Sequence, residues 1–322
     1  MDGSYEKINY RLRPAKSIER KMLCDAFRRL SAFDKVENYQ YIGFGSTYFS
    51  DFILFHKALG IANMISIEKD EENKERFMFN RPFRCVKLEF GQSNEVLSKL
   101  NWDAKTILWL DYDNKLDSHV LSDVRFFCIN ASPGSVIVVS VNAHPISRPD
   151  NVKLSQLPAH RLQKLREDVG DEKVPPDIKG KDFAKWGTAK IFRRIIDSEI
   201  LQTLNERNVG CVSGTNFLYQ QLFNFHYADG AKMLTMGGLL YDKGQEDVLA
   251  QCDFKNLSFY QEDEEPYVIE VPNLTYREIR HLDTQLPIKE DELPTLSAVP
   301  KEDIEKYAKM YRYFPTFTEA DI

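Results

Sequence analysis

Two glycines and one acidic residue are spaced in a way that suits the binding of a nucleoside. Gly43 and Gly45 lie in the segment IGFGS (42–46), and Glu68 follows 25 residues after Gly43. Glycines let backbone N–H groups approach a ligand closely, and an acid about 20 residues further on can accept both hydroxyls of a ribose. The alternatives are a tight strand-to-helix turn for the glycines and a solvated strand-end carboxylate for Glu68.

Two further polar residues follow strongly apolar segments. Asp111 ends the run TILWLD, where a charge is costly unless a site uses it. His144 follows the run SVIVVSVNA directly, and a histidine can remove a proton near neutral pH. We therefore take Asp111 and His144 as candidate catalytic residues, although a loop histidine is more often merely exposed.

Strands and helices alternate over the part of the chain that carries these residues. The pattern predicts strands at 39–44, 63–69, 83–90, 105–113 and 135–143, with helices around 47–60, 71–80, 93–100 and 118–131. Such alternation is typical of an α/β fold with a doubly wound, parallel sheet, whose ligands bind at the carboxyl ends of the strands. The apolar runs 106–110 and 135–139 favour central strands, buried on both faces.

The pattern changes after this region. Residues 144–181 are rich in proline and charge, and we interpret them as an insertion or lid. A helix at 183–207 is followed by two apolar runs within 217–241 that meet at Asp229-Gly230. Asp-Gly between such runs is a strong hairpin signal, so the sheet is expected to end in an antiparallel pair.

Extensions flank the predicted core of residues 38–241. An N-terminal arm, 1–37, contains an amphipathic helix at 15–32, and an extension, 242–322, contains a strand at 267–271 and two helices. The extension has 9 Lys+Arg and 19 Asp+Glu, a net charge of −10; the total is −6, so residues 1–241 carry +4. This acidic extension could pack against the core, a second copy of the chain or another protein. A charge of +4 gives only weak support for nucleic acid as a partner.

Basic residues gather in the N-terminal arm. They are Arg11, Arg13, Lys16, Arg20 and Lys21. A solvated helix face is the favoured interpretation, and the alternative is a contact with a phosphate-bearing substrate.

In the order of these features, the sequence resembles the class I S-adenosylmethionine-dependent methyltransferases. Within that class it is similar to O-methyltransferases. That resemblance implies a mostly parallel seven-stranded sheet with a terminal hairpin, and S-adenosylmethionine as cofactor. It implies that Asp111 lies near the transferred methyl group and that Glu68 binds the ribose. The other cofactor-binding residues that it implies are Gly43, Phe44, Gly45 and Ser46 at the amino acid and ribose, and Gln92 and Ser93 at the adenine edge. For Ser93, a plain helix cap is equally open. Tyr41 stands where many members carry an acid.

The stretch after Asp111 also resembles cation-dependent O-methyltransferases, which hold a divalent metal there. Asp113, Asn114 and Asn142 supply oxygen atoms that would suit Mg²⁺, but the aspartate expected beside Asn142 is missing. A turn stabilised by Asp113 and Asn114 is favoured, and we assign no metal site.

Composition indicates a globular protein, with 43% hydrophobic and 29% charged residues. The start of the sequence is polar, no apolar run reaches the ~20 residues that span a bilayer, and the five cysteines form no C-x-x-C pair. We therefore expect a cytoplasmic methyltransferase, directed to oxygen, with an unknown acceptor. The alternatives are a catalytically silent scaffold or sensor of the same fold, and an enzyme that modifies RNA or DNA.

Overall fold

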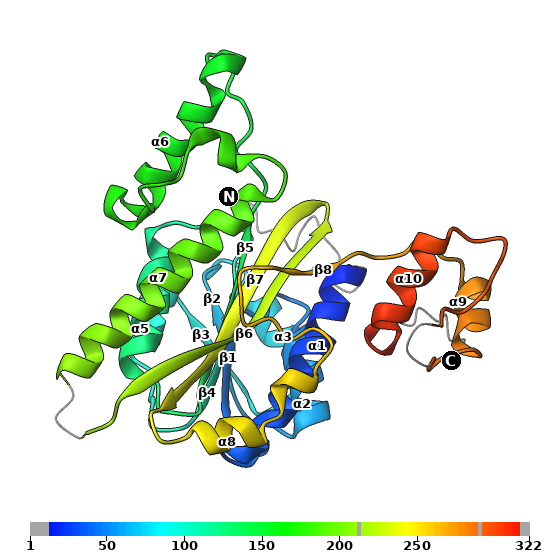
Figure 1. Cartoon of the computed structure of the whole chain (residues 1–322). Coiled ribbons are helices and arrows are strands. Elements are labelled where there is room, and N and C mark those ends of the chain that lie inside the picture. Colours follow the sequence, from blue (N-terminus) through cyan, green and yellow to red (C-terminus); the bar gives the residue numbers. More distant parts are fainter. Residues whose placement is uncertain (1–12, 211–213, 289–291, 316–322) are drawn as a thin grey trace.

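The computed structural model describes residues 13–210, 214–288 and 292–315. Its centre is a sheet of eight strands in the order β3-β2-β1-β4-β5-β7-β6-β8 (Figure 1). The strands are β1 (Gln40–Gly43), β2 (Asn63–Glu68), β3 (Val86–Phe90), β4 (Thr106–Asp111), β5 (Val136–Asn142), β6 (Phe217–Asp229), β7 (Ala231–Asp242) and β8 (Tyr267–Ile269). All five strands predicted before residue 144 are present, which confirms the α/β class.

Strands β1 to β5 pair in parallel, and β7 runs antiparallel to β5. β6 and β7 form the expected antiparallel hairpin, whose turn contains Gly230 with a φ of 89°. A positive φ is a conformation that glycine adopts without a steric cost. The predicted order of five parallel strands and a closing hairpin is therefore confirmed.

The expected number of seven strands is wrong. β8, from the C-terminal extension, pairs in parallel with β6, with Phe225 opposite Tyr267 and Tyr227 opposite Ile269. This pairing satisfies backbone groups along part of an edge that β6 would otherwise leave open. Tyr267 and Ile269 are also buried, so the eighth strand adds apolar contacts to the sheet.

Helices cover both faces of the sheet, and Figure 1 shows α5 and α7 on one side and α1 and α2 on the other. Side chains alternate between the faces, so Trp109 packs with α1 and α2 while Leu108 packs with α5 and α7. The helices are α1 (Pro14–Arg28), α2 (Ser50–Leu59), α3 (Lys74–Asn80), α4 (Ser93–Leu97), α5 (Ser118–Asn130), α6 (Leu157–Val169), α7 (Gly187–Gly210), α8 (Glu246–Gln251), α9 (Tyr276–Asp283) and α10 (Lys301–Met310). Within the described ranges, no helix is long and apolar enough to cross a membrane.

The inserted region and the C-terminal extension lie at different places around the sheet (Figure 1). The region 144–181 contains α6, which Figure 1 shows projecting beyond the sheet. The C-terminal extension returns to α1, where the Tyr313 hydroxyl donates to Asp25 at 2.8 Å and Lys21 donates to the Phe314 carbonyl at 3.0 Å. The division into arm, core and extension stays a prediction.

A glycine in β7 gives a test of the sheet. A Cβ atom at Gly237 would lie 2.2 Å from the Ile137 carbonyl oxygen and 2.8 Å from Val138 Cα, both in the backbone of β5. We expect Gly237→Ala to lower the free energy of unfolding by about 2 kcal/mol, measured by urea denaturation. Gly210→Ala is the control, because a Cβ there meets nothing within 4 Å. Equal stability of the two variants would contradict this packing.

Candidate functional site

The glycine loop and Glu68 meet at the carboxyl ends of β1 and β2. The Gly45 N–H donates to Glu68 Oε1 at 3.1 Å and to Ser66 Oγ at 2.9 Å, and the Ser66 hydroxyl donates to the same carboxylate oxygen at 2.7 Å. A Cβ atom on Gly45 would lie 2.6 Å from Ser66 Oγ and 2.4 Å from the Phe49 ring, so only glycine permits this approach. Two residues predicted from their spacing are thus in direct contact.

Glu68 lies almost completely buried, with 6% of its surface exposed. Burial raises the pKa of its carboxyl from the usual 4.5 to about 7, against the opposing effect of the hydrogen bonds from Ser66 and Gly45. The group therefore changes charge close to neutral pH. A polar ligand at this edge of the sheet would contact a carboxyl group that can be either protonated or ionised near neutral pH.

The ends of β1, β3 and β4 form the neighbouring part of the site. The Phe44 ring packs edge-on against Tyr112, with their centroids 5.1 Å apart. The hydroxyls of Tyr112 and Ser93 both donate to Asp123 Oδ2, whereas Asp123 Oδ1 is buried and has no hydrogen-bond partner. An unpartnered buried carboxylate oxygen can accept a hydrogen bond from a ligand.

The plain cap proposed for Ser93 is wrong. The N-cap of α4 is Gln92, which makes no side-chain cap hydrogen bond, and Ser93 is the first residue of the helix. Its hydroxyl is turned away from the α4 backbone because Asp123, on α5, accepts it. Sequence reasoning missed Asp123; the available signal was an acidic residue among the apolar positions of α5.

Asp111, at the end of β4, is bound by a lysine of the N-terminal arm. Lys16 Nζ lies 2.6 Å from Asp111 Oδ1, 2.7 Å from Glu19 Oε2 and 3.2 Å from the Tyr227 hydroxyl. The same ammonium lies 4.5 Å from the centroid of the Trp109 ring. Lys16 is 1% exposed, so it fills the space beside Asp111 at this edge of the sheet.

The solvated helix face predicted for the basic arm is therefore wrong for Lys16 and for Arg20, which is 9% exposed. The reason lies in the placement of α1. The backbone N–H of Lys16 donates to the Asp229 carboxylate at 3.0 Å, so the hairpin turn caps the start of α1 and holds its first turns against the sheet. Arg11 lies outside the described residues.

Charges in this cluster compensate each other. Burial by itself lowers the pKa of Lys16, but the carboxylates of Asp111 and Glu19 outweigh it and raise that pKa overall. Burial raises the pKa of Glu19, and Lys16 opposes part of this change. One ammonium between two carboxyl groups thus stays protonated, and Glu19 is the group that is costly to ionise.

His144 is exposed and lies on the segment after β5. Its backbone N–H donates to Asn142 Oδ1 at 2.9 Å, and its carbonyl accepts a hydrogen bond from Lys115. No hydrogen bond or ion pair in the described part of the chain joins the His144 ring to Asp111. In the same ranges, no three His, Cys, Asp or Glu side chains gather as a metal site.

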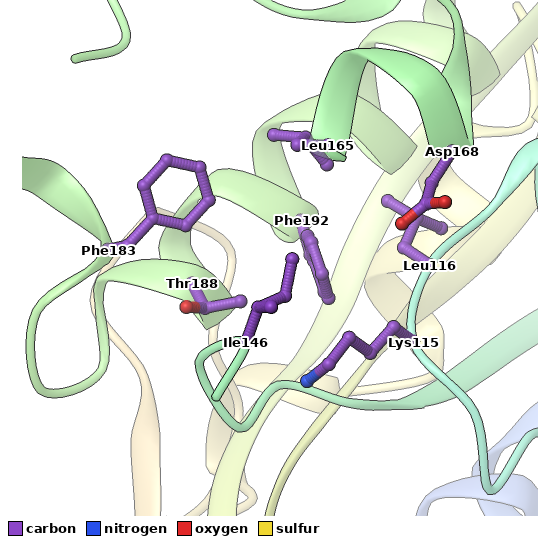
Figure 2. Close-up of a pocket in the computed structure, with 8 residues that line it drawn as sticks. All are labelled: Lys115, Leu116, Ile146, Leu165, Asp168, Phe183, Thr188 and Phe192. Carbon is purple, nitrogen blue, oxygen red and sulfur yellow. The ribbon is translucent and has the colours of Figure 1, made fainter. Parts of the chain in front are cut away.

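A small cavity lies between the inserted segment and the core, as Figure 2 shows. Its volume is about 10 Å³, which is room for about one water molecule. Lys115 and Leu116 enter it from the segment after β4, and Ile146 from the segment after β5. The remaining lining residues come from α6, α7 and the segment between them: Leu165, Asp168, Phe183, Thr188 and Phe192. The insertion therefore packs against the edge of the sheet that carries the candidate site.

Removal of the buried ammonium tests the cluster. We expect Lys16→Met to lower the free energy of unfolding by about 3 kcal/mol at neutral pH, because Asp111 and Glu19 lose their cation. The loss should shrink as the pH falls and Glu19 takes up a proton. Lys57→Met, at an exposed position of α2, is the control. The free energy of unfolding is measured by chemical denaturation. If Lys16→Met lowers it no more than the control does, Lys16 is not needed to stabilise the cluster.

Two solved structures are similar to parts of this chain. Trm1 from Pyrococcus horikoshii, solved with S-adenosyl-L-methionine, is 10% identical, with a TM-score of 0.45 over 72% of this chain and 57% of that one. The chain thus spans less than two thirds of that protein. The O-methyltransferase TomG from Streptomyces achromogenes, solved with SAM, is 14% identical, with a TM-score of 0.35 over 68% and 78% of the two chains.

No curated protein matches the sequence. A family model described as "Putative O-methyltransferase" matches residues 8–322, which include the glycine loop, Glu68 and both ends of the Lys16–Asp111 pair. That match covers nearly the whole chain. The chain therefore belongs to this O-methyltransferase family.

Proposed function

We propose that this protein transfers the methyl group of S-adenosylmethionine to an oxygen atom of its acceptor. The observation that carries the proposal is the contact of Glu68 with the Gly45 backbone, which joins an acid at the end of β2 to the loop after β1. Membership of the O-methyltransferase family supports both the reaction and its direction to oxygen. The acceptor itself is left open.

The residues at this edge fit an adenosyl group. Glu68 offers carboxylate oxygens for the ribose hydroxyls, and the rings of Phe44 and Tyr112 offer apolar surface beside them. Asp123 Oδ1 is buried without a partner, as expected of an acceptor that a ligand N–H would complete. When bound, S-adenosylmethionine supplies a methyl group attached to a positively charged sulfur.

The roles proposed for the chain's own residues follow from their positions. Glu68 orients the ribose. Asp111, held by Lys16, lies at the strand end where we place the reacting groups. His144, exposed on the rim after β5, would take the proton of an acceptor hydroxyl. The main contribution of the fold is the alignment of donor and acceptor.

A catalytically silent member of the family is the second candidate. It is favoured by the burial of Lys16 beside Asp111, because the chain's own side chain fills that part of the strand edge. Such a protein would bind the donor, or nothing, without transferring a methyl group. Methyl transfer to candidate acceptors, measured with isotopically labelled donor, separates it from an enzyme.

Binding of S-adenosylhomocysteine tests the role of Glu68. We expect Glu68→Gln to weaken binding about 10- to 100-fold in calorimetry, because hydrogen bonds to a charged group are lost. The matched control is Glu89→Gln, an exposed acid on the neighbouring strand β3. Equal affinities of Glu68→Gln and wild type for S-adenosylhomocysteine would refute the assignment of Glu68 to the ribose. If wild type does not bind S-adenosylhomocysteine, the proposal that S-adenosylmethionine is the methyl donor is refuted.

The pH dependence of stability gives an independent test of the same group. Because the pKa of Glu68 is about 7 in the folded protein and near 4.5 when exposed, the unfolded chain loses this proton first as pH rises. The unliganded protein should therefore lose up to about 3 kcal/mol of stability between pH 4.5 and 7, relative to Glu68→Gln. Affinity for S-adenosylhomocysteine should rise across pH 7, where Glu68 ionises. Parallel stability profiles for the two proteins would contradict the raised pKa.

A further inference from the structure

Among the described residues, Arg20 is a buried cation without a counter-ion in direct contact. It is 9% exposed, and its Nε is buried and has no hydrogen-bond partner. In the described ranges, the structure places no ion-pair partner against its guanidinium. An arginine stays charged at all ordinary pH values, so its burial is costly unless a partner compensates the charge.

The start of α2 presents hydrogen-bond donors near this arginine. α1 packs against α2, and the N-cap residue Phe49 has a left-handed backbone, with a φ of 46°, and no side-chain cap. The hydroxyl of Ser50, the first residue of this ten-residue helix, is buried and has no partner. The N-terminal end of a helix favours an anion, and here an unpartnered hydroxyl lies beside it.

Asp51 is the acidic residue close to this place, and it is held by another group. The Tyr41 hydroxyl donates to its carboxylate, and no ion pair in direct contact joins Asp51 to Arg20. Burial raises the pKa of Asp51, and the charge of Arg20 offsets this only in part. The hydrogen-bonding capacity of Arg20 is therefore left for something other than Asp51.

We propose that Arg20, Ser50 and the start of α2 form a subsite for one anionic oxygen group, a carboxylate or a phosphate. The loop 43–46, which we assign to the donor, leads directly into α2, so the subsite borders the proposed cofactor site. Two sources have this chemistry: the α-carboxylate of the donor's amino acid portion, and an acidic group on the acceptor. The first source rests on the proposed function; the subsite itself does not.

Two nucleosides that differ in the anionic group test the first source. S-adenosylhomocysteine carries the carboxylate, and 5′-methylthioadenosine lacks the amino acid portion. We expect Arg20→Gln to weaken binding of the first about 10- to 100-fold and to leave the second unchanged, in calorimetry. Ser50→Ala should act in the same direction with a smaller effect. Arg28→Gln, an exposed arginine on the same helix, is the control.

Inorganic phosphate tests the second source. If an acidic acceptor uses the subsite, phosphate binds the protein saturated with S-adenosylhomocysteine, Arg20→Gln abolishes this binding, and nucleoside affinities do not change. If the donor uses it, phosphate binds only in the absence of S-adenosylhomocysteine.

Stability separates ligand binding from a structural role of the arginine. Arg20 makes no hydrogen bond or ion pair within the described residues, but its charge partly offsets the burial of Asp51, so Arg20→Gln should lower the melting temperature of the unliganded protein only slightly. A strongly lowered melting temperature with equal weakening of both nucleosides would overturn the proposal, as would unchanged binding of phosphate and of both nucleosides. If wild type binds neither nucleoside, the proposed function fails. The anion subsite is then tested by phosphate alone: binding that is lost in Arg20→Gln supports the subsite, and no such binding refutes it.

Discussion

The position of the N-terminal helix depends on one buried ammonium group. Lys16 could not lie below the surface without Asp111, Glu19 and Tyr227, because the loss of water around a charge must be compensated by close partners. These partners come from β4, from α1 itself and from β6, so the helix is held where the two strands end. The Asp229 carboxylate at the start of α1 adds a second attachment from the hairpin turn. With α1 held at both points, Arg20 lies close enough to Asp51, in the first turn of α2, for its charge to act on that carboxyl.

Asp111 and Glu68, two acids on this edge of the sheet, thus have different surroundings. Asp111 has a cation of the chain beside it, whereas the donors to Glu68 within the described residues are neutral and include the Gly45 N–H and the Ser66 hydroxyl. Neutral donors offset burial only in part, which is why the pKa of Glu68 rises to about 7. The half of the edge at β1 and β2 therefore has an acid that a ligand can still engage, and the half at β4 is already occupied by a side chain of the same molecule.

Much of the fold could be predicted from local patterns, because alternating apolar strands and helices require a parallel sheet. The contact of Gly45 with Glu68 followed from the same logic, since neighbouring parallel strands end at one edge. The eighth strand could not be assigned to the sheet, because three paired residues of the tail contain no information about which edge they join. The burial of Lys16 and Arg20 was missed since helical periodicity identifies only one covered face, and α1 is covered by the sheet and by the tail residues Tyr313 and Phe314. Asp123 was missed because its partners lie on other elements.

The contacts of α1 also bear on the order in which the chain can fold during synthesis. Lys16 and Asp111 are 95 residues apart in sequence, Lys16 and Tyr227 are 211 residues apart, and the Asp25–Tyr313 contact spans 288 residues. Contacts between such distant residues form late and slow the folding of a domain. The helix that bears Lys16 can pack against α2 early, but its contacts with the hairpin and the tail must wait until those segments have been made. Until then part of this amphipathic helix stays exposed, and exposed apolar surface on an incompletely folded chain promotes aggregation.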